Sequence, residues 1–235
     1  MLINLLKRIY SKTGNHNYSI DQKLFENFFD NISIYDCGYE LIRIGNSNDG
    51  GYLIPNILDK INLCFSAGVG DNFTFEQDLT RRGIKCFFAD GTVKPNNEID
   101  ILIKNINSYN DDKNITINNW LLHGISDHKD PHIILKLDIE GSEIPTIYNM
   151  DEEFFKYIEI LIIEFHDFLY LGNHFGNRVI YEIFEKILKN FTICHIHPNN
   201  FGATKLINNI EIPAILEFTF INNNLISQKK TISNN

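Results

Sequence analysis

Short, almost wholly apolar runs recur along the chain, and amphipathic stretches separate them. Buried strands of a parallel sheet have this character, because helices cover both of their faces. The runs that we expect to form strands are residues 63–65, 85–89, 115–125, 132–138, 158–165, 191–197 and 215–221. Because such runs alternate with helical patterns, the sequence predicts an α/β fold with a mostly parallel sheet and helices on both faces.

Apolar residues at helical spacing predict helices between these strands. The clearest of them lie at residues 73–82, 97–106 and 178–189. Residues 1–35 also follow a helical pattern, in which Leu24, Phe25, Phe28 and Phe29 form one apolar face. We see no internal repeat, and we divide the chain into an N-terminal helical extension (1–40), one α/β domain (41–226) and a polar tail (227–235).

Two apolar stretches in residues 42–55 flank the turn sequence Asn-Asp-Gly-Gly at 48–51. This pattern predicts a β-hairpin. Arg43, Asp49 and Tyr52 give the hairpin polar groups of use to a binding site. We therefore expect these three residues to border an acceptor pocket, although an idle hairpin also fits the pattern.

Composition excludes some classes of partner. The chain has 235 residues, of which 43% are hydrophobic, and a net charge of −9 with a pI of about 5.3. This acidic balance disfavours binding to a phosphate backbone, so we expect no nucleic-acid partner. No apolar run has the length of a transmembrane helix. Four cysteines lack paired spacing and are expected to be free thiols in a reducing, cytoplasmic compartment, namely Cys37, Cys64, Cys86 and Cys194.

Residues 61–71 (INLCFSAGVGD) form the centre of the predicted site. An apolar run ends there in a turn of small residues, and a predicted helix follows. Gly68 and Gly70 let the backbone approach a ligand closely, and the helix N-terminus favours polar ligand groups. Phe73 occupies the position of the third glycine of a dinucleotide-binding turn, so the match to that motif is incomplete. Asp90 ends the next strand about 20 residues later, the spacing at which a carboxylate reaches a ribose diol.

Polar residues follow most of the predicted strands. Ligands of an open parallel sheet bind beyond the carboxyl ends of its strands, near the point where strand order reverses. The residues at these positions are Gly68, Asp90, Ser126, Asp138, Glu164, His166 and His197. We therefore expect the functional groups to gather at this edge of the sheet.

The segment 135–143, LKLDIEGSE, resembles the FkbM-type branch of S-adenosylmethionine-dependent methyltransferases. Lys136, Asp138, Glu140, Gly141 and Glu143 match that family's pattern after the fourth strand. The sequence HGISD at 123–127 is similar to the family's strand-three ending, and IIE at 162–164 to its strand five. The resemblance extends over roughly residues 40–222.

This resemblance implies a Rossmann-like sheet of seven strands, with an antiparallel last strand. It also implies methyl transfer from S-adenosylmethionine, often to a hydroxyl of a sugar or natural product. By this analogy we expect a small-molecule or glycan acceptor. The oligomeric state stays open.

The resemblance further implies where the methyl donor binds. Ser66 stands where these enzymes usually have an acid that contacts the methionine end of the donor, and Asp71 is expected to compensate. We expect the ribose at Asp90 and the adenine near residues 124–127. The expected donor contacts are Ser66, Gly68, Gly70, Asp71, Asp90, Gly91, Ser126, Asp127 and Asp138.

Transfer of a methyl group from a sulfonium is an in-line displacement, so the enzyme must mainly align donor and acceptor. An alcohol acceptor also needs a base or a metal ion to help remove its proton. We expect this reaction centre at Asp138, Glu164, His166 and His197, with His166 or His197 as the base. Alternatively, Asp138, Glu164 and His166 hold a divalent cation. The metal-free version is favoured because no single segment has a tight ligand spacing.

Several of these residues also have a structural interpretation. Glu140 and Glu143 would favour the first turn of the following helix without any role in binding. Asp90 would merely cap the end of a strand. Asn199 and Asn200 follow the sixth strand, and we expect them on the acceptor side of the site.

Two other functions fit part of the pattern. A nicotinamide-dependent dehydrogenase shares the strand, turn, helix and acid, but the G-x-G-x-x-G motif is missing. A methyltransferase-like scaffold that has lost donor binding stays open because of Ser66. Binding of S-adenosylhomocysteine and of NAD separates the three functions.

Overall fold

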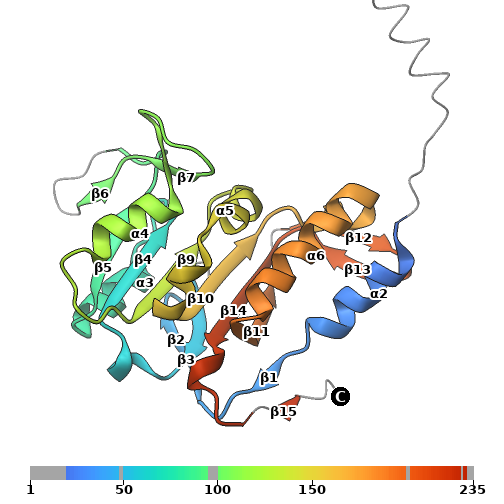
Figure 1. Ribbon diagram of the computed structural model, residues 1–235, viewed down its shortest axis with the longest axis horizontal. Coiled ribbons are helices and arrows are strands. Elements are labelled where there is room, and N and C mark those ends of the chain that lie inside the picture. The colour runs from blue at the N-terminus through green and yellow to red at the C-terminus, as the bar shows by residue number, and fades with distance from the viewer. Residues whose placement is uncertain (1–19, 48–49, 95–99, 200–201, 229, 232–235) are drawn as a thin grey trace, which may run out of the picture.

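The computed structural model describes residues 20–47, 50–94, 100–199, 202–228 and 230–231, and its fold is α/β (Figure 1). A seven-stranded sheet in the order β11-β14-β10-β9-β4-β5-β6 forms its centre. These strands are β4 (Leu63–Ala67), β5 (Lys85–Ala89), β6 (Ile101–Leu102), β9 (Ile133–Leu137), β10 (Ile158–Phe165), β11 (Phe191–Pro198) and β14 (Leu216–Asn222). Only β14 runs antiparallel to its neighbours within this sheet. The predicted Rossmann-like sheet with an antiparallel last strand is confirmed.

The strand order reverses between β4 and β9. From β4 the chain moves outward to β5 and β6, and it then returns to place β9 on the other side of β4. The carboxyl ends of β4 and β9 therefore flank the crevice in which α/β proteins of this kind bind their ligands.

Different elements cover the two faces of the sheet (Figure 1). One face packs against the helices α2 (Gln22–Asn31), α4 (Ile117–Ile125), α5 (Glu143–Asn149) and α6 (His174–Leu188). The other face packs against α3 (Thr74–Arg81) and a hairpin of β2 (Leu41–Gly45) and β3 (Gly51–Pro55). The predicted hairpin is confirmed, and it takes the place of a covering helix beside β11 and β14.

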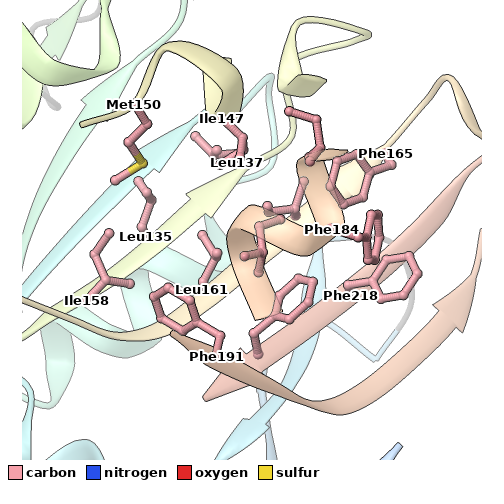
Figure 2. Packing of buried hydrophobic residues seen from close by; sticks show 14 of the residues in the cluster. Leu135, Leu137, Ile147, Met150, Ile158, Leu161, Phe165, Phe184, Phe191 and Phe218 are labelled. Atoms are coloured by element: carbon pink, nitrogen blue, oxygen red, sulfur yellow. The ribbon is translucent and has the colours of Figure 1, made fainter. Parts of the chain in front are cut away.

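An aromatic cluster forms much of the core beneath α6. Phe184 of α6 lies beside Phe165 and Phe218 of the sheet, with ring centroids 5.3 and 5.1 Å away (Figure 2). Phe28 of α2 approaches Phe184 to 5.0 Å. These rings bury large apolar areas and prefer such tilted contacts. Helix α2 is therefore part of the main core.

The strand predicted at 115–125 is wrong. These residues form the end of the short strand β8 (Asn114–Thr116) and then helix α4, whose N-cap Thr116 accepts a hydrogen bond from the backbone of Asn119. Ile117, Trp120 and Leu121 are all buried, and their spacing has the period of a helix. The Thr116 cap gives the decisive local signal.

The helix predicted at 97–106 is also wrong in its described part. Residues 95–99 lie outside the described residues. The chain after them forms β6, the third strand of the sheet, and then β7 (Asn105–Asn107), which pairs with β8. Apolar residues at 101–103 and 106 fit both periods, and pairing of β6 with β5 selects the strand.

The remaining elements are short. They are η1 (Leu58–Lys60), η2 (Glu152–Tyr157), η3 (Phe168–Gly172), η4 (Asn223–Leu225), the pair β1 (Tyr35–Asp36) with β15 (Lys230–Thr231), and the hairpin β12 (Thr204–Ile207) with β13 (Ile210–Pro213). Strand β15 thus lies in the segment expected to be a polar tail. The four cysteines are free thiols. Within the described ranges, every helix is too short or too polar to cross a membrane.

Candidate functional site

A cavity of about 240 Å³ opens at the switch point, beyond the carboxyl ends of β4, β5 and β9. Gly68, Gly70 and Asp71 of the predicted turn line it. Gly68 has a φ of +73°, and a Cβ atom there would lie 1.5 Å from the carbonyl oxygen of Asp138. Only glycine fits such a close approach of two loops. The turn is therefore built to bring backbone, not side chains, to the cavity.

Asp90 lines the same cavity, but protein donors already surround its carboxylate. Oδ2 accepts hydrogen bonds from the backbone of Val69 and Gly70 at 3.1 and 3.0 Å, and Oδ1 accepts two from Thr92 at 2.7 Å. Burial alone would raise the pKa of Asp90, but the bonds from Thr92, Gly70 and Val69 outweigh it and lower the pKa. Asp90 therefore holds the glycine turn in place, a structural role that does not depend on binding a ribose.

Glu76, an acid in the first turn of α3, was not among the residues expected in the site. Its side chain is 1% exposed and lines the cavity. Ser66 of β4 donates a hydrogen bond to Oε1 at 2.5 Å, whereas Oε2 is buried without a hydrogen-bond partner among the described residues. The pattern around α3 gives no sign of this contact, because a helical Glu usually faces solvent.

Lys136 and Tyr52 lie between the glycine turn and Asp138. The Lys136 ammonium donates to the carbonyl oxygen of Gly68 at 2.8 Å and lies 3.8 Å from Asp138 Oδ2. The Tyr52 hydroxyl donates to the same Oδ2 at 3.3 Å. Tyr52 is 3% exposed and lines the cavity, so the hairpin reaches the site, while the expected role of Tyr52 at an acceptor pocket stays a prediction.

His166 is held by four carboxylates. Its Nδ1 lies 3.0 Å from Oε1 of Glu143, which is 1% exposed. Its Nε2 lies 3.9 Å from Asp138, 3.4 Å from Glu140 and 3.8 Å from Glu164. Burial would lower the pKa of His166, but the hydrogen bond and charge of Glu143, with Asp138 and Glu140, raise it to about 9. His166 therefore carries a proton at neutral pH.

Glu143 is the residue that orients this imidazole. Its carboxylate also accepts hydrogen bonds from the backbone of Ile139 and Gly141 at 2.9 and 3.1 Å. The intervening Glu140 has a φ of +53°, a conformation that is uncommon for any residue with a side chain. The turn 139–141 is thus wrapped around Glu143, and this favours a role beyond the first turn of α5.

A second cavity, of about 420 Å³, begins at His166. Asp167, Tyr170 and Asn173 of the loop after β10 line it, together with Lys205 of β12. His166 lines this second cavity, and its Nε2 faces Asp138 and Glu140 in the wall of the first. The imidazole therefore lies between the second cavity and the carboxylates that line the first.

Glu164, Glu217 and His197 form a polar row across three neighbouring strands. Glu164 pairs with Glu217, and Glu217 with His197, in the register of β10, β14 and β11. Burial, followed by the charge of Asp138, raises the pKa of Glu164 to about 6. Burial, followed by the charge of Glu164, raises the pKa of Glu217 to about 8. Asn199 donates to Glu164 at 2.8 Å, and its expected place on the acceptor side stays a prediction.

Residues 17–218 match the family model of the methyltransferase FkbM domain. The chain belongs to the FkbM methyltransferase family. This match confirms the resemblance seen in the segment 135–143, of which Lys136, Asp138 and Glu140 line the first cavity and Glu143 contacts His166. A comparison with curated proteins finds no match to the chain.

Some predicted contacts lie elsewhere in this FkbM fold. Ser126 and Asp127 follow the end of α4, which returns to the amino edge of the sheet, and they do not line either cavity. Gly124 packs on the ring of Phe65 instead, where a Cβ would approach it to 2.3 Å. The structure therefore does not bring the expected adenine contacts to the site. The error follows from the misassigned strand at 115–125.

The other predicted residues of the FkbM site occupy its margins. Gly91 packs against Asn105, where a Cβ would lie 2.3 Å from the side chain. Arg43 is exposed and donates to the carbonyl oxygen of Gly51 at 2.7 Å. Burial, followed by the charges of His197 and Arg43, lowers the pKa of His195. Two more predicted residues, Asp49 and Asn200, lie outside the described residues.

Three groups of this FkbM site have the chemistry to hold a metal ion. Ligand atoms of Asp138, Glu140 and His166 lie within 4.8 Å of one another. Glu140 takes the place of Glu164 in the expected set. A metal-ligating histidine usually has its other ring nitrogen hydrogen-bonded to a carboxylate, and Glu143 makes this contact with Nδ1 of His166. The residues present therefore fit a divalent cation.

Proposed function

We propose that this protein is an S-adenosylmethionine-dependent methyltransferase that methylates a hydroxyl of a sugar, glycan or other small molecule. The observation that carries the proposal is the position of His166, which lines the second cavity while its Nε2 faces Asp138 and Glu140 in the wall of the first. The first cavity has the glycine turn and the carboxylates of a nucleoside site, and the second lies beyond Asp138 and Glu140. An in-line displacement needs donor and acceptor on opposite sides of one reacting group.

The first cavity fits the donor. The close approach at Gly68 leaves backbone groups along its floor, and Asp90 and Thr92 form the end nearest β5. Asp138 and Glu140 place negative charge at the other end, where the donor's sulfonium supplies the methyl group. Carboxylates near a sulfonium favour its binding by Coulomb attraction. Asp90 and Thr92 would therefore hold the nucleoside end of the donor, and Asp138 and Glu140 would hold its sulfonium end.

The acceptor hydroxyl would lose its proton to His166. Glu143 holds Nδ1 and leaves Nε2 directed at Asp138 and Glu140. An imidazole that is oriented by a buried carboxylate is a recurring general base. Because the pKa of His166 is raised to about 9, the neutral form is scarce at pH 7 but strongly basic. The neighbouring Glu164 and Asn199 would bind acceptor hydroxyls.

The second candidate mechanism uses a divalent cation at Asp138, Glu140 and His166, as their grouping favours. Such an ion lowers the pKa of a bound hydroxyl and so replaces the general base. Turnover after removal of metal ions separates the mechanisms. Activity that survives a chelator supports the base, whereas activity that is lost and then restored by magnesium or manganese supports the cation.

The proposed function is tested by transfer of labelled methyl groups from S-adenosylmethionine to a panel of sugars, nucleotide sugars and hydroxylated small molecules. We expect label in at least one acceptor. Loss of transfer in His166→Ala, with transfer retained in His132→Ala, supports the reaction centre. His132 is a matched control because it also contacts a carboxylate, Glu159 at 2.6 Å, but at the amino edge of the sheet. Equal activity of both variants would remove His166 from the mechanism.

A further inference from the structure

Glu76 has a buried carboxylate, and only one of its two oxygens accepts a hydrogen bond among the described residues. Ser66 donates to its Oε1, but Oε2 has no hydrogen-bond partner in the described part of the chain. Its side chain is 1% exposed, and ion pairs of the described residues do not include it. A buried carboxylate without a counter-charge is costly. A cationic group on a bound ligand would supply the missing counter-charge.

The position of Glu76 identifies that ligand. Glu76 lines the first cavity together with Gly68, Gly70 and Asp138. Ser66 is the next-to-last residue of β4, where the family resemblance implies an acid, and its hydroxyl donates a hydrogen bond to a carboxylate from α3 instead. The negative charge is therefore present, but it is supplied by a residue ten positions later in the chain.

We infer that Glu76 binds the α-ammonium group at the methionine end of the donor, with Ser66 as the residue that positions its carboxylate. This inference rests on the proposed use of S-adenosylmethionine. Charge-assisted hydrogen bonds are stronger than neutral ones, so Glu76 is the main anchor of that end of the donor. Asp71, the substitute that the sequence suggests, is exposed at the cavity rim and has a weaker, solvent-screened field.

The test compares two ligands by calorimetry. S-adenosylhomocysteine has the amino-acid end, whereas 5′-methylthioadenosine lacks it. In Glu76→Gln, affinity for S-adenosylhomocysteine should fall roughly 10- to 100-fold, the loss of one charge-assisted hydrogen bond, while affinity for methylthioadenosine stays within about twofold of wild type. Glu182→Gln, an exposed acid on α6 outside both cavities, is the matched control and should leave both affinities unchanged, whereas Asp71→Asn tests the alternative anchor. A selective loss in Asp71→Asn instead would overturn the inference.

Equal effects of Glu76→Gln on both ligands, or no effect on either, would also overturn it. The proposed function would still stand in these cases, because wild-type protein binds S-adenosylhomocysteine. Wild-type protein that binds neither ligand contradicts both. If Glu76→Gln does not fold, Glu76→Asp retains the charge but withdraws the carboxylate by one methylene. The same selective loss is expected in that variant, and unchanged affinities would refute the role of Glu76.

Discussion

Replacement of Glu217 by glutamine should stabilise the protein at high pH. Glu217 is 9% exposed and lies opposite Glu164 in the sheet. Burial and the charge of Glu164 raise its pKa from 4.5 to about 8. Because the folded state binds this proton more tightly than the unfolded state, folded molecules hold more protons between pH 4.5 and 8. Stability therefore falls as pH rises through this window.

The size of the effect follows from the shift. Each pKa unit corresponds to about 1.4 kcal/mol, so the ionised Glu217 opposes folding by roughly 3–5 kcal/mol above pH 8. At pH 5 the same group costs less than about 1 kcal/mol. Glutamine mimics the protonated form and does not ionise. Glu217→Gln should therefore gain about 3 kcal/mol over wild type at pH 8 and little at pH 5.

Urea unfolding of both proteins at pH 5 and pH 8 measures this difference. Glu182→Gln, at an exposed position on α6, is the control and should change stability by less than about 0.5 kcal/mol at either pH. A gain for Glu217→Gln that is the same at both pH values would refute the assigned pKa. A loss of stability at pH 8 would show that the ionised carboxylate has a favourable partner.

Three further predictions concern the site and the core. If His166 is the base, the rate of methyl transfer should rise about tenfold per pH unit toward pH 9 and then level, and a flat profile above pH 7 would contradict it. Gly68→Ala should lose binding of S-adenosylhomocysteine, because its Cβ would meet the carbonyl oxygen of Asp138; calorimetry that gives wild-type affinity would show that the two loops separate freely. Phe184→Ala should cost about 3–5 kcal/mol in urea unfolding, since it removes a ring from the centre of the aromatic cluster. A cost below about 1 kcal/mol would mean that the core collapses into the space.

Strands whose residues are all buried could be predicted from the sequence alone. All eight residues of β10 are buried, and its apolar run has the observed bounds. Helix α4 was misassigned because its apolar residues form a nearly continuous run, and only the cap at Thr116 distinguishes it from a strand. Because this stretch was taken for a strand, Ser126 and Asp127 were expected at the carboxyl edge of the sheet. They instead follow the end of α4, at the amino edge.

Site residues could be predicted from the sequence where polar side chains directly follow the carboxyl end of a strand. His166 lies within 4 Å of both Asp138 and Glu164, as expected for residues at the carboxyl ends of neighbouring parallel strands. Glu76 was missed because a residue in the next helix supplies it, and the contact with Ser66 depends on how α3 packs. Glu217 was missed because β14 runs antiparallel, so that a residue near its start reaches the edge where the parallel strands end.

Calorimetric titration of the wild-type protein with S-adenosylhomocysteine, and separately with NAD, tests the central claim most directly. We expect saturable binding of one equivalent of S-adenosylhomocysteine and no binding of NAD. A folded protein that binds NAD instead would be a dehydrogenase-like member of this fold, and one that binds neither would be a scaffold without a donor site. Either result would contradict the proposed methyl transfer.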